Sequence, residues 1–432
     1  MAGGRMGATE ARVQGNPVSE LAERFGTPLF VYDTDVLEHT YRELRGLLPE
    51  SVDIFFSLKA NPNISVCAFL GRQGAGAEVS SYVELLTALR AGMAPEDIIF
   101  LGPGKDRREL EACVDAGIHA VVCESLEELR QLDELAGLRG ADGCRAVLRM
   151  NPAFHSKGSG LAMGGKPRQF GIDQEALSRS KGVVSALRHV TVTGLHAYMG
   201  TRFLDASDVI RNTEQILAAA EELAGELGIP LETVDFGGGL GVAYFDNETD
   251  PDVTALGRGL RAAVEGFHGR HPTCRLIMEL GRYLTALAGT YVVKARYVKE
   301  SMGDWFIVAD GGTNHHMAAV GVGSFVKRNF PVRHLTRPDD PVTHRYSLTG
   351  PLCTPNDVIA KRVSLPEVRP GDLLGVERSG AYGPTASPGH FLSHGFPAEV
   401  LVHRGRATLV REPDSAEELL ARQRLVDFGT DT

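Results

Sequence analysis

Several absences narrow the class of this protein before any motif is considered. Among 432 residues there are only six cysteines, and no two have the close spacing of a zinc ribbon or a disulfide framework. No apolar run approaches the roughly 20 residues that cross a membrane. The formal net charge is −10, which argues against a nucleic-acid partner. We therefore expect neither membrane insertion nor nucleic-acid binding.

The first residues lack the apolar stretch of a secretory signal. Met1–Pro17 is polar and rich in glycine, so we expect a short disordered leader and a cytoplasmic protein. The length allows two domains of ordinary size. The 43% hydrophobic and 23% charged residues are compatible with a large buried core.

Short apolar runs alternate with amphipathic helical stretches, such as Ala206–Leu227, from about residue 54 to residue 281. Because short right-handed crossovers join neighbouring parallel strands, this pattern predicts an α/β fold with a (β/α)8 barrel. An open doubly wound sheet is the alternative. The eight predicted strands are Ile54–Leu58, Ala77–Ser81, Ile98–Gly102, Ala120–Glu124, Ala146–Met150, Val192–Met199, Val234–Gly238 and Leu276–Gly281.

The pattern changes after the barrel to strands without long helices between them, which predicts a C-terminal all-β domain. The segment Thr27–Tyr32 is a candidate extra strand of that domain. We predict a leader and joining strand at 1–32, a barrel at 33–285 and a β domain at 286–432. The predicted strands are Thr290–Tyr297, Trp305–Ala309, Arg345–Thr349, Leu373–Glu377, Glu399–Val402 and Ala407–Arg411.

Polar groups gather at the ends of the predicted barrel strands, where this fold places its active site. Strand one ends at Lys59, and an unpaired buried ammonium there would be costly. Taken alone, a lysine already exposed in the loop is the simpler explanation. The other strand ends bring Ser80, Arg149, His196, Tyr198, Gly237–Gly239, Glu279 and Arg282 to the same rim.

These groups suit a cofactor with an aldehyde, a phosphate and a pyridine ring. A lysine can bond to the aldehyde, and glycines after strand seven let backbone N–H groups approach a phosphate. A carboxylate beside the pyridine nitrogen favours the protonated ring, with a pKa change of about 1–3 units. The protonated ring is an electron sink. Gly237–Gly239 also resembles a dinucleotide fingerprint, but its position after a late strand disfavours that alternative.

Seven motifs in order are similar to those of the fold-type III pyridoxal-phosphate decarboxylases, the family of diaminopimelate and ornithine decarboxylases. The resemblance implies pyridoxal 5'-phosphate as cofactor and an alanine racemase-like arrangement of barrel plus β domain. The motifs are SLKANPN at Lys59, AEVSS at Ser80, GLHAYMGT at Tyr198, DFGGGLG at Gly238, ELGR at Glu279, GPLCTPND at Cys353 and SGAYG at Tyr382.

The resemblance also implies roles for individual residues. Lys59 is the cofactor-bearing lysine, Glu279 pairs with the ring nitrogen, and Tyr198 stacks on the ring where relatives usually have histidine. Cys353 is the acid that protonates the α-carbon in the other subunit's site, so a homodimer with shared active sites is implied. Without this context, Cys353 is equally an inert thiol. Further cofactor contacts are expected from Ser80, Arg149, His196, Thr201, Gly238, Gly239, Gly281, Arg282 and Tyr382.

Two departures from the family pattern concern the substrate. Diaminopimelate decarboxylases have an acid after the cysteine, which binds the distal amine, where this chain has Thr354. They also hold the distal carboxylate with an arginine and a tyrosine, where this chain has Thr313–Val320. Such polar recognition can change kcat/KM by several powers of ten, so we expect diaminopimelate to be a poor substrate. Substrate contacts are expected from Arg282, His315, His316 and Thr354.

Two stretches, Ala162–Gly171 and Gly350–Pro355, resemble decarboxylases that act on aminoacyl groups attached to acyl carrier proteins, as in butirosin biosynthesis. The resemblance predicts an acidic aminoacyl substrate, of glutamyl or aspartyl type, thioesterified to such a carrier in a natural-product pathway. The basic segment Gly321–Arg345 is either a carrier-docking surface or a solvated loop. Its cations are Lys327, Arg328, Arg333, Arg337 and Arg345.

Four other functions compete with this hypothesis. A decarboxylase of a free amino acid shares every cofactor motif. A racemase of the same fold places arginine at the ring nitrogen, which Glu279 disfavours. A non-catalytic cofactor-binding protein is a bare barrel without Cys353 and Tyr382. A metal hydrolase needs clustered ligands, and the adjacent His315 and His316 do not provide them, so we expect no metal.

Overall fold

The computed structural model describes residues 10–141, 143–155, 158–320 and 328–428. These residues form two compact units. One is Asp35–Leu287, and the other combines the described residues up to Thr34 with those from Ala288 onward. None of the described helices has both the length and the apolar character needed to cross a membrane.

The Asp35–Leu287 unit contains a closed barrel of eight parallel strands, which confirms the predicted (β/α)8 fold and excludes the open sheet. The strands follow one another around the barrel in chain order, and β14 (Arg275–Leu280) closes it by pairing with β4 (Val52–Ser57). Between them lie β5 (Gly76–Val79), β6 (Ile98–Phe100), β7 (Ala120–Cys123), β8 (Cys144–Asn151), β11 (Val190–His196) and β13 (Thr233–Gly238).

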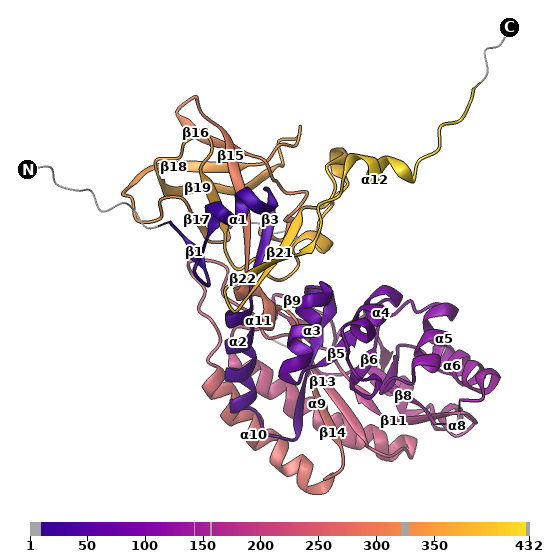
Figure 1. The fold of residues 1–432 in the computed structure, drawn as a ribbon. Helices are drawn as coiled ribbons and strands as arrows, with labels where there is room; N and C mark the ends of the chain where they lie inside the picture. Colours follow the sequence, from indigo (N-terminus) through magenta and orange to yellow (C-terminus); the bar gives the residue numbers. More distant parts are fainter. Residues whose placement is uncertain (1–9, 142, 156–157, 321–327, 429–432) are drawn as a thin grey trace, which may run out of the picture. The chain divides into compact units, whose positions relative to one another are not determined.

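Helices connect the barrel strands and pack around them (Figure 1). Several begin at a side-chain cap, which satisfies a backbone N–H group that has no partner within the helix. Asp205, for example, accepts a hydrogen bond from Ser207 N at 2.8 Å. The helices of this unit include α2 (Thr34–Leu47), α3 (Ile64–Gln73), α4 (Tyr82–Arg90), α5 (Arg107–Ala116), α6 (Leu126–Arg139), α7 (Gln174–Ser178), α8 (Lys181–Val184), α9 (Ala206–Leu227), α10 (Val253–Arg270) and α11 (Arg282–Thr285).

Apolar side chains from several strands form a buried cluster in this unit. Phe55 and Ile277 come from the two strands that close the barrel, and both are fully buried. Other members of the cluster include Ile99, Val122 and Val147, from β6, β7 and β8. Since the interior is filled in this way, the polar groups at the carboxyl ends of the strands are left as the place for chemistry.

The other unit is built on antiparallel pairings around one long strand, β15 (Gly289–Ser301). This strand pairs with β3 (Leu29–Asp33), with β16 (Asp304–Ala309) and with β20 (Leu373–Val376). The predicted β domain in the C-terminal region is confirmed, with one short α-helix, α12 (Ala416–Ala421), near its end. The unit also contains β17 (Val332–His334), β18 (Val342–Thr349), β19 (Val358–Pro366), β21 (Ala398–His403) and β22 (Arg406–Arg411).

The expected disordered leader is wrong for residues 10–17. Strands β1 (Arg12–Val13) and β2 (Asn16–Pro17) form a small hairpin, and α1 (Val18–Phe25) follows directly. Gln14 Nε2 donates hydrogen bonds to Asp33 Oδ1 at 2.7 Å and to Val402 O at 3.0 Å. These partners are distant in sequence, so a polar, glycine-containing segment is ordered by contacts that its own composition does not reveal.

Candidate active site

Lys59 lies at the rim of the barrel, in the short turn η1 (Leu58–Ala60) that follows β4. Its Nζ is 3.2 Å from Glu78 Oε2 and 5.2 Å from the centroid of the Tyr198 ring. Glu78 is fully buried at the end of β5 and accepts a hydrogen bond from Ser80 Oγ at 2.8 Å. A buried carboxylate therefore stabilises the ammonium and fixes its position, a partnership that the sequence alone did not predict.

Three buried side chains converge at the ends of β11, β13 and β14. His196, Asp235 and Glu279 each offer one atom to a group in which all distances are within 4.8 Å. His196 Nε2 is 3.1 Å from Glu279 Oε1. The sequence predicted His196 and Glu279 as site residues, and the structure adds Asp235.

The two carboxyl groups of this cluster have different charges. Burial, together with the negative charge of Glu279, raises the pKa of Asp235 well above its usual range. Burial alone would also raise the pKa of Glu279, but the hydrogen bond and charge of His196, with the charge of Lys59, lower it to about 2. At neutral pH, Glu279 is therefore the anion and Asp235 is neutral.

This cluster fits the ring nitrogen of the expected cofactor. Glu279 is an ionised, buried carboxylate that is hydrogen-bonded to His196 and to the neutral Asp235, so it would favour a protonated nitrogen placed beside it. The same three side chains resemble a set of metal ligands. However, the Lys59 ammonium is close enough to lower the pKa of Glu279, and it would repel a metal cation there.

The backbone after β13 approaches its neighbours closely. A Cβ atom on Gly238 would lie 2.2 Å from Glu279 O, and one on Gly239 would lie 1.9 Å from Gly200 O. Gly239 also has a φ of +73°. Only glycine permits this combination, which leaves bare backbone at the rim, as a phosphate site requires. Thr201, the other predicted phosphate contact, lies beside this loop in β12 (Gly200–Thr201).

Gly281 brings the end of β14 against the turn that carries Lys59. A Cβ atom on Gly281 would lie 2.7 Å from Ala60 Cβ and 3.1 Å from Ser57 O. A larger residue would push the two strand ends apart. The predicted site residue Gly281 thus keeps Glu279 and Lys59 at one place on the rim.

Both predicted arginines of the barrel are held by side chains that the sequence analysis missed. Arg149 Nη1 lies 2.6 Å from Glu124 Oε1, and both side chains are buried. Arg282 Nη1 donates a hydrogen bond to Tyr244 OH at 3.1 Å. Glu124 ends a predicted strand, which was the available signal, whereas nothing in the sequence pointed to Tyr244.

The other predicted site residues belong to the β unit. Cys353 is exposed in the loop after β18, next to Thr354. Buried Asp357 ties this loop to the segment after β16, because its carboxylate accepts hydrogen bonds from Leu352 N at 2.8 Å and Thr313 N at 2.7 Å. Tyr382 has a φ of +54°, a conformation that non-glycine residues adopt mainly where the surroundings impose it.

His315 and His316 are buried in the β unit and have different partners. His315 Nε2 contacts Gly395 O at 2.9 Å, and His316 Nε2 contacts Ser379 Oγ at 2.8 Å. Burial lowers the pKa of His315 to about 4 and the pKa of His316 to about 3. Both imidazoles are therefore neutral at pH 7, and the segment that they occupy offers no positive charge.

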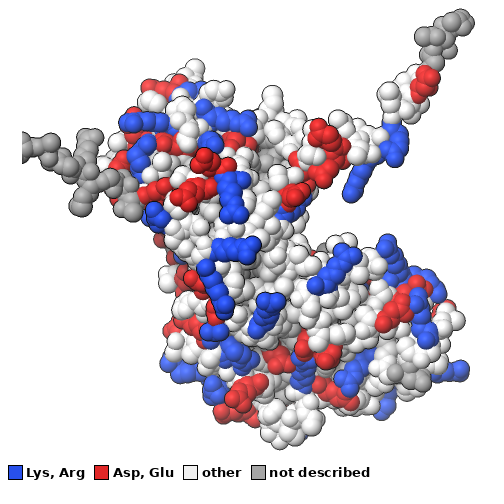
Figure 2. Space-filling view, viewed as in Figure 1, with Lys and Arg blue, Asp and Glu red and all other residues white. Residues whose placement is uncertain are grey.

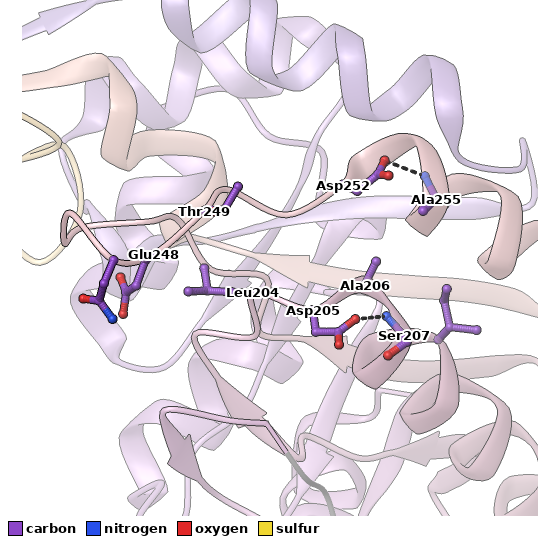
Figure 3. A pocket seen from close by; sticks show the side chains of 10 residues that line it. Leu204, Asp205, Ala206, Ser207, Glu248, Thr249, Asp252 and Ala255 are labelled. Carbon is purple, nitrogen blue, oxygen red and sulfur yellow. Dashed lines mark hydrogen bonds between the residues drawn. The ribbon is translucent and has the colours of Figure 1, made fainter.

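A groove of about 630 Å³ lies on the barrel unit between the starts of α9 and α10 (Figure 3). Asp205 and Asp252, which cap these two helices, line it together with Glu248 and apolar side chains such as Leu204. An acidic lining is unfavourable for a phosphate, so the groove does not suit the anionic end of the cofactor.

The chain matches known proteins over most of its length. Residues 34–286 match the family model of the pyridoxal-dependent decarboxylase, pyridoxal binding domain. A protein of Niallia circulans named L-glutamyl-[BtrI acyl-carrier protein] decarboxylase is 37% identical, over 94% of this chain and 96% of its own length. Diaminopimelate decarboxylase of Aquifex aeolicus is 30% identical, over 95% of each chain.

Solved structures show the same likeness. The diaminopimelate decarboxylase of M. jannaschii in complex with L-lysine superimposes with a TM-score of 0.87, at 26% identity and over 95% of each chain. The Helicobacter pylori enzyme with L-lysine has a TM-score of 0.84, at 26% identity and over 94% of this chain and 98% of its own.

Proposed function

The chain belongs to the pyridoxal-dependent decarboxylases, and we propose that it removes the α-carboxylate of an acidic aminoacyl group thioesterified to an acyl carrier protein. Its cofactor is pyridoxal 5'-phosphate. When bound, the cofactor ring accepts the electron pair left behind as carbon dioxide departs.

In this proposal the barrel holds the cofactor at four points. Lys59, positioned by Glu78, would hold the cofactor through its aldehyde once the ammonium has lost a proton, with water leaving as the bond forms. Glu279, ionised and hydrogen-bonded to His196, would hold the ring nitrogen in its protonated form. Tyr198 stacks on the ring, and the backbone at Gly238 and Gly239 with Thr201 holds the phosphate. Ser80, Arg149, Gly281 and Arg282 complete the cofactor contacts from the barrel.

Cys353 and Tyr382 complete the proposal from the β unit. The exposed thiol of Cys353 delivers a proton to the substrate α-carbon, a role that needs access to the reacting atom. Asp357 ties this loop, at Leu352 N, to Thr313 N in the segment after β16. Tyr382 reaches the cofactor phosphate, and its φ of +54° fits a side chain directed by a functional constraint.

The neutral character of the segment after β16 is the observation that carries the substrate assignment. His315 and His316 are buried and uncharged at pH 7, and Met317–Val320 is apolar. A free distal carboxylate would have no cation here to compensate its charge. A thioester has no charge at that position, because its carboxyl group is consumed in the bond to the carrier. Thr354 likewise offers no carboxylate for a distal amine.

The name of the Niallia circulans relative supports the same class of substrate, since it describes a glutamyl group on a carrier protein. The diaminopimelate decarboxylases among the relatives, at 30% identity for the Aquifex aeolicus enzyme, favour the alternative of a free amino acid. These two classes differ at the distal end of the substrate, which is where this chain lacks charged side chains.

Substrate competition tests the proposal. L-Glutamate thioesterified through its side-chain carboxyl to the BtrI carrier is compared with free meso-diaminopimelate, L-glutamate and L-lysine, with mass spectrometry of the products. We expect kcat/KM for the carrier-bound group to exceed that for free diaminopimelate by about 10³-fold or more, because polar groups left unpaired discriminate strongly. Efficient turnover of free diaminopimelate, with none of the carrier-bound group, would contradict the proposal.

A further inference from the structure

The chain makes an excursion over the rim of the barrel between β8 and β10 (Ile172–Asp173). It returns parallel to the strand that it left, with Asp173 opposite Asn151. On the way, β9 (Leu161–Ala162) pairs with β12, and Met163 N donates a hydrogen bond to Met199 O at 3.0 Å. The excursion therefore runs beside the segment that carries Tyr198, at the carboxyl end of the barrel strands.

Buried side chains hold the backbone of this excursion in place. Asn151 Oδ1 accepts a hydrogen bond from Gly165 N at 2.9 Å, while Asn151 Nδ2 donates one to Lys166 O at 3.1 Å. Glu124 Oε2 accepts a hydrogen bond from Gly171 N at 2.9 Å. The turn between Gly165 and Gly171 is thus fixed at both ends by groups that also order the site rim.

The tip of this turn presents two cations to solvent. Lys166 and Arg168 are exposed, and their side chains make no ion pair or hydrogen bond with any part of the chain that the structure describes. The acids of the following segments are engaged elsewhere. Asp173 accepts a hydrogen bond from Asn151, Glu175 pairs with Arg179, and Asp208 pairs with Arg211. A local charge of +2 at the rim is therefore uncompensated by these neighbours.

This local charge is opposite in sign to the charge of the whole molecule. The chain as a whole carries a formal charge of −10, and on the face seen in Figure 2 acidic and basic side chains are interspersed. An acidic macromolecule approaching such a surface is repelled overall and needs a local cationic point close to the active-site rim. Acyl carrier proteins are typically acidic.

The basic segment Gly321–Arg345, which the sequence leaves as either a docking surface or a solvated loop, has part of its positive charge compensated within the chain. Lys327 lies outside the described residues. Arg337 is already bound to Asp372 at 2.6 Å and to Asp340 at 3.5 Å, so its charge is compensated within the chain.

We propose that the turn at Lys166–Arg168 is a docking point for the anionic surface of the carrier protein that delivers the substrate. The inference rests on the proposed function and adds the place where the carrier binds. Because hydrogen bonds fix the backbone of this turn, its two cations stay beside the rim. A carrier bound there needs only its flexible arm to reach the site. The contact acts mainly on association, and its effect weakens as salt increases.

Charge reversal at the tip tests the proposal. The variant Lys166→Glu/Arg168→Glu is compared with Lys181→Glu/Arg188→Glu. The second variant changes two exposed cations that precede β11 and so lie at the amino end of the barrel strands. Three L-glutamyl thioesters serve as probes, with the glutamyl group on the BtrI carrier, on phosphopantetheine and on pantetheine. For the tip variant and the carrier-bound probe we expect KM to rise roughly tenfold at low salt, with kcat unchanged.

Each outcome bears on the proposal. An unchanged KM for the pantetheine probe, with wild-type behaviour of the Lys181/Arg188 variant, supports docking at the tip. A rise in KM for the phosphopantetheine probe assigns the contact to the phosphate of the arm, and no rise assigns it to the acidic side chains of the carrier. The docking proposal would be overturned if the two variants had equal effects. It would also be overturned if the tip variant left KM for the carrier-bound probe unchanged. If wild-type enzyme decarboxylates none of the carrier-bound probe, the proposed function fails as well.

Discussion

Asp235 and Glu279, the neighbouring carboxyl groups at the ends of β13 and β14, differ in charge. Isosteric substitution of each side chain tests this difference. Glu279→Gln removes the anion that faces the ring nitrogen, so we expect bound cofactor to be retained and kcat to fall by about 10²–10³-fold, as when one oriented electrostatic partner is lost. Asp235→Asn exchanges one neutral group for another and keeps the acceptor for Gly237 N, so we expect kcat within about tenfold of wild type.

Cofactor content by absorbance and kcat by product formation distinguish these variants. The reverse order of effects would show that Asp235 is the charged group and that Glu279 is neutral. If both substitutions change kcat only slightly and to the same extent, this cluster does not act through the ring nitrogen.

Site residues at the ends of barrel strands could be predicted from the sequence. Residues whose role depends on a side chain distant in sequence could not. Lys59 and Glu279 end barrel strands, so their side chains fall on the rim by topology alone. Asp235 stands two residues before the glycine loop, and only the fold reveals that it shares a buried space with Glu279. Tyr244 gives no signal at all, because its partner Arg282 is 38 residues away.

Among the elements, the ends of β6, β7 and β8 depend on one buried carboxylate. Glu124 pairs with Arg149 at 2.6 Å and also accepts hydrogen bonds from Gly102 N at 3.1 Å and Gly171 N at 2.9 Å. Glu124→Ala leaves a buried guanidinium without its counter-charge, so we expect a loss of about 3–5 kcal/mol in the free energy of unfolding. Urea unfolding followed by circular dichroism measures it.

A surface pair on the next helix provides the control for this prediction. Glu127 pairs with Arg130 at 3.3 Å, and both side chains are more than half exposed. We expect Glu127→Ala to change the free energy of unfolding by less than about 1 kcal/mol. A similar loss in both variants would mean that the buried pair contributes no more than an exposed one.

The strands of the barrel were predictable because buried parallel strands are short, continuous apolar runs. The strand β19 (Val358–Pro366) was missed because its apolar run is not continuous. Its run is interrupted by the exposed pair Lys361–Arg362, and Arg362 has a φ of +56°. The register of β19 against β18 also shifts. An irregular strand of this kind is specified by its partner more than by its own alternation.

The division of the whole molecule into a barrel and a β unit followed from a change in periodicity near residue 286, which a sequence displays directly. The candidate early strand Thr27–Tyr32 corresponds to β3, which pairs with β15 although the entire barrel separates the two in sequence. The predicted cofactor and substrate residues fall into both units. The family resemblance implies that a complete site takes its barrel residues and its cysteine from different subunits.

Subunit complementation tests this arrangement. Lys59→Ala and Cys353→Ala are each expected to be nearly inactive, since one loses the cofactor-bearing amine and the other the proton donor. In an equal mixture with free subunit exchange, half of the dimers are mixed, and each mixed dimer contains one intact site, so about a quarter of wild-type activity should return. The control mixes Lys59→Ala with Glu279→Gln. Both changes lie in the barrel unit, so no mixed dimer has an intact site and activity should stay low. Native mass spectrometry confirms that mixed dimers form. If they form and the first mixture stays as inactive as the control, the cysteine and the lysine act within one subunit.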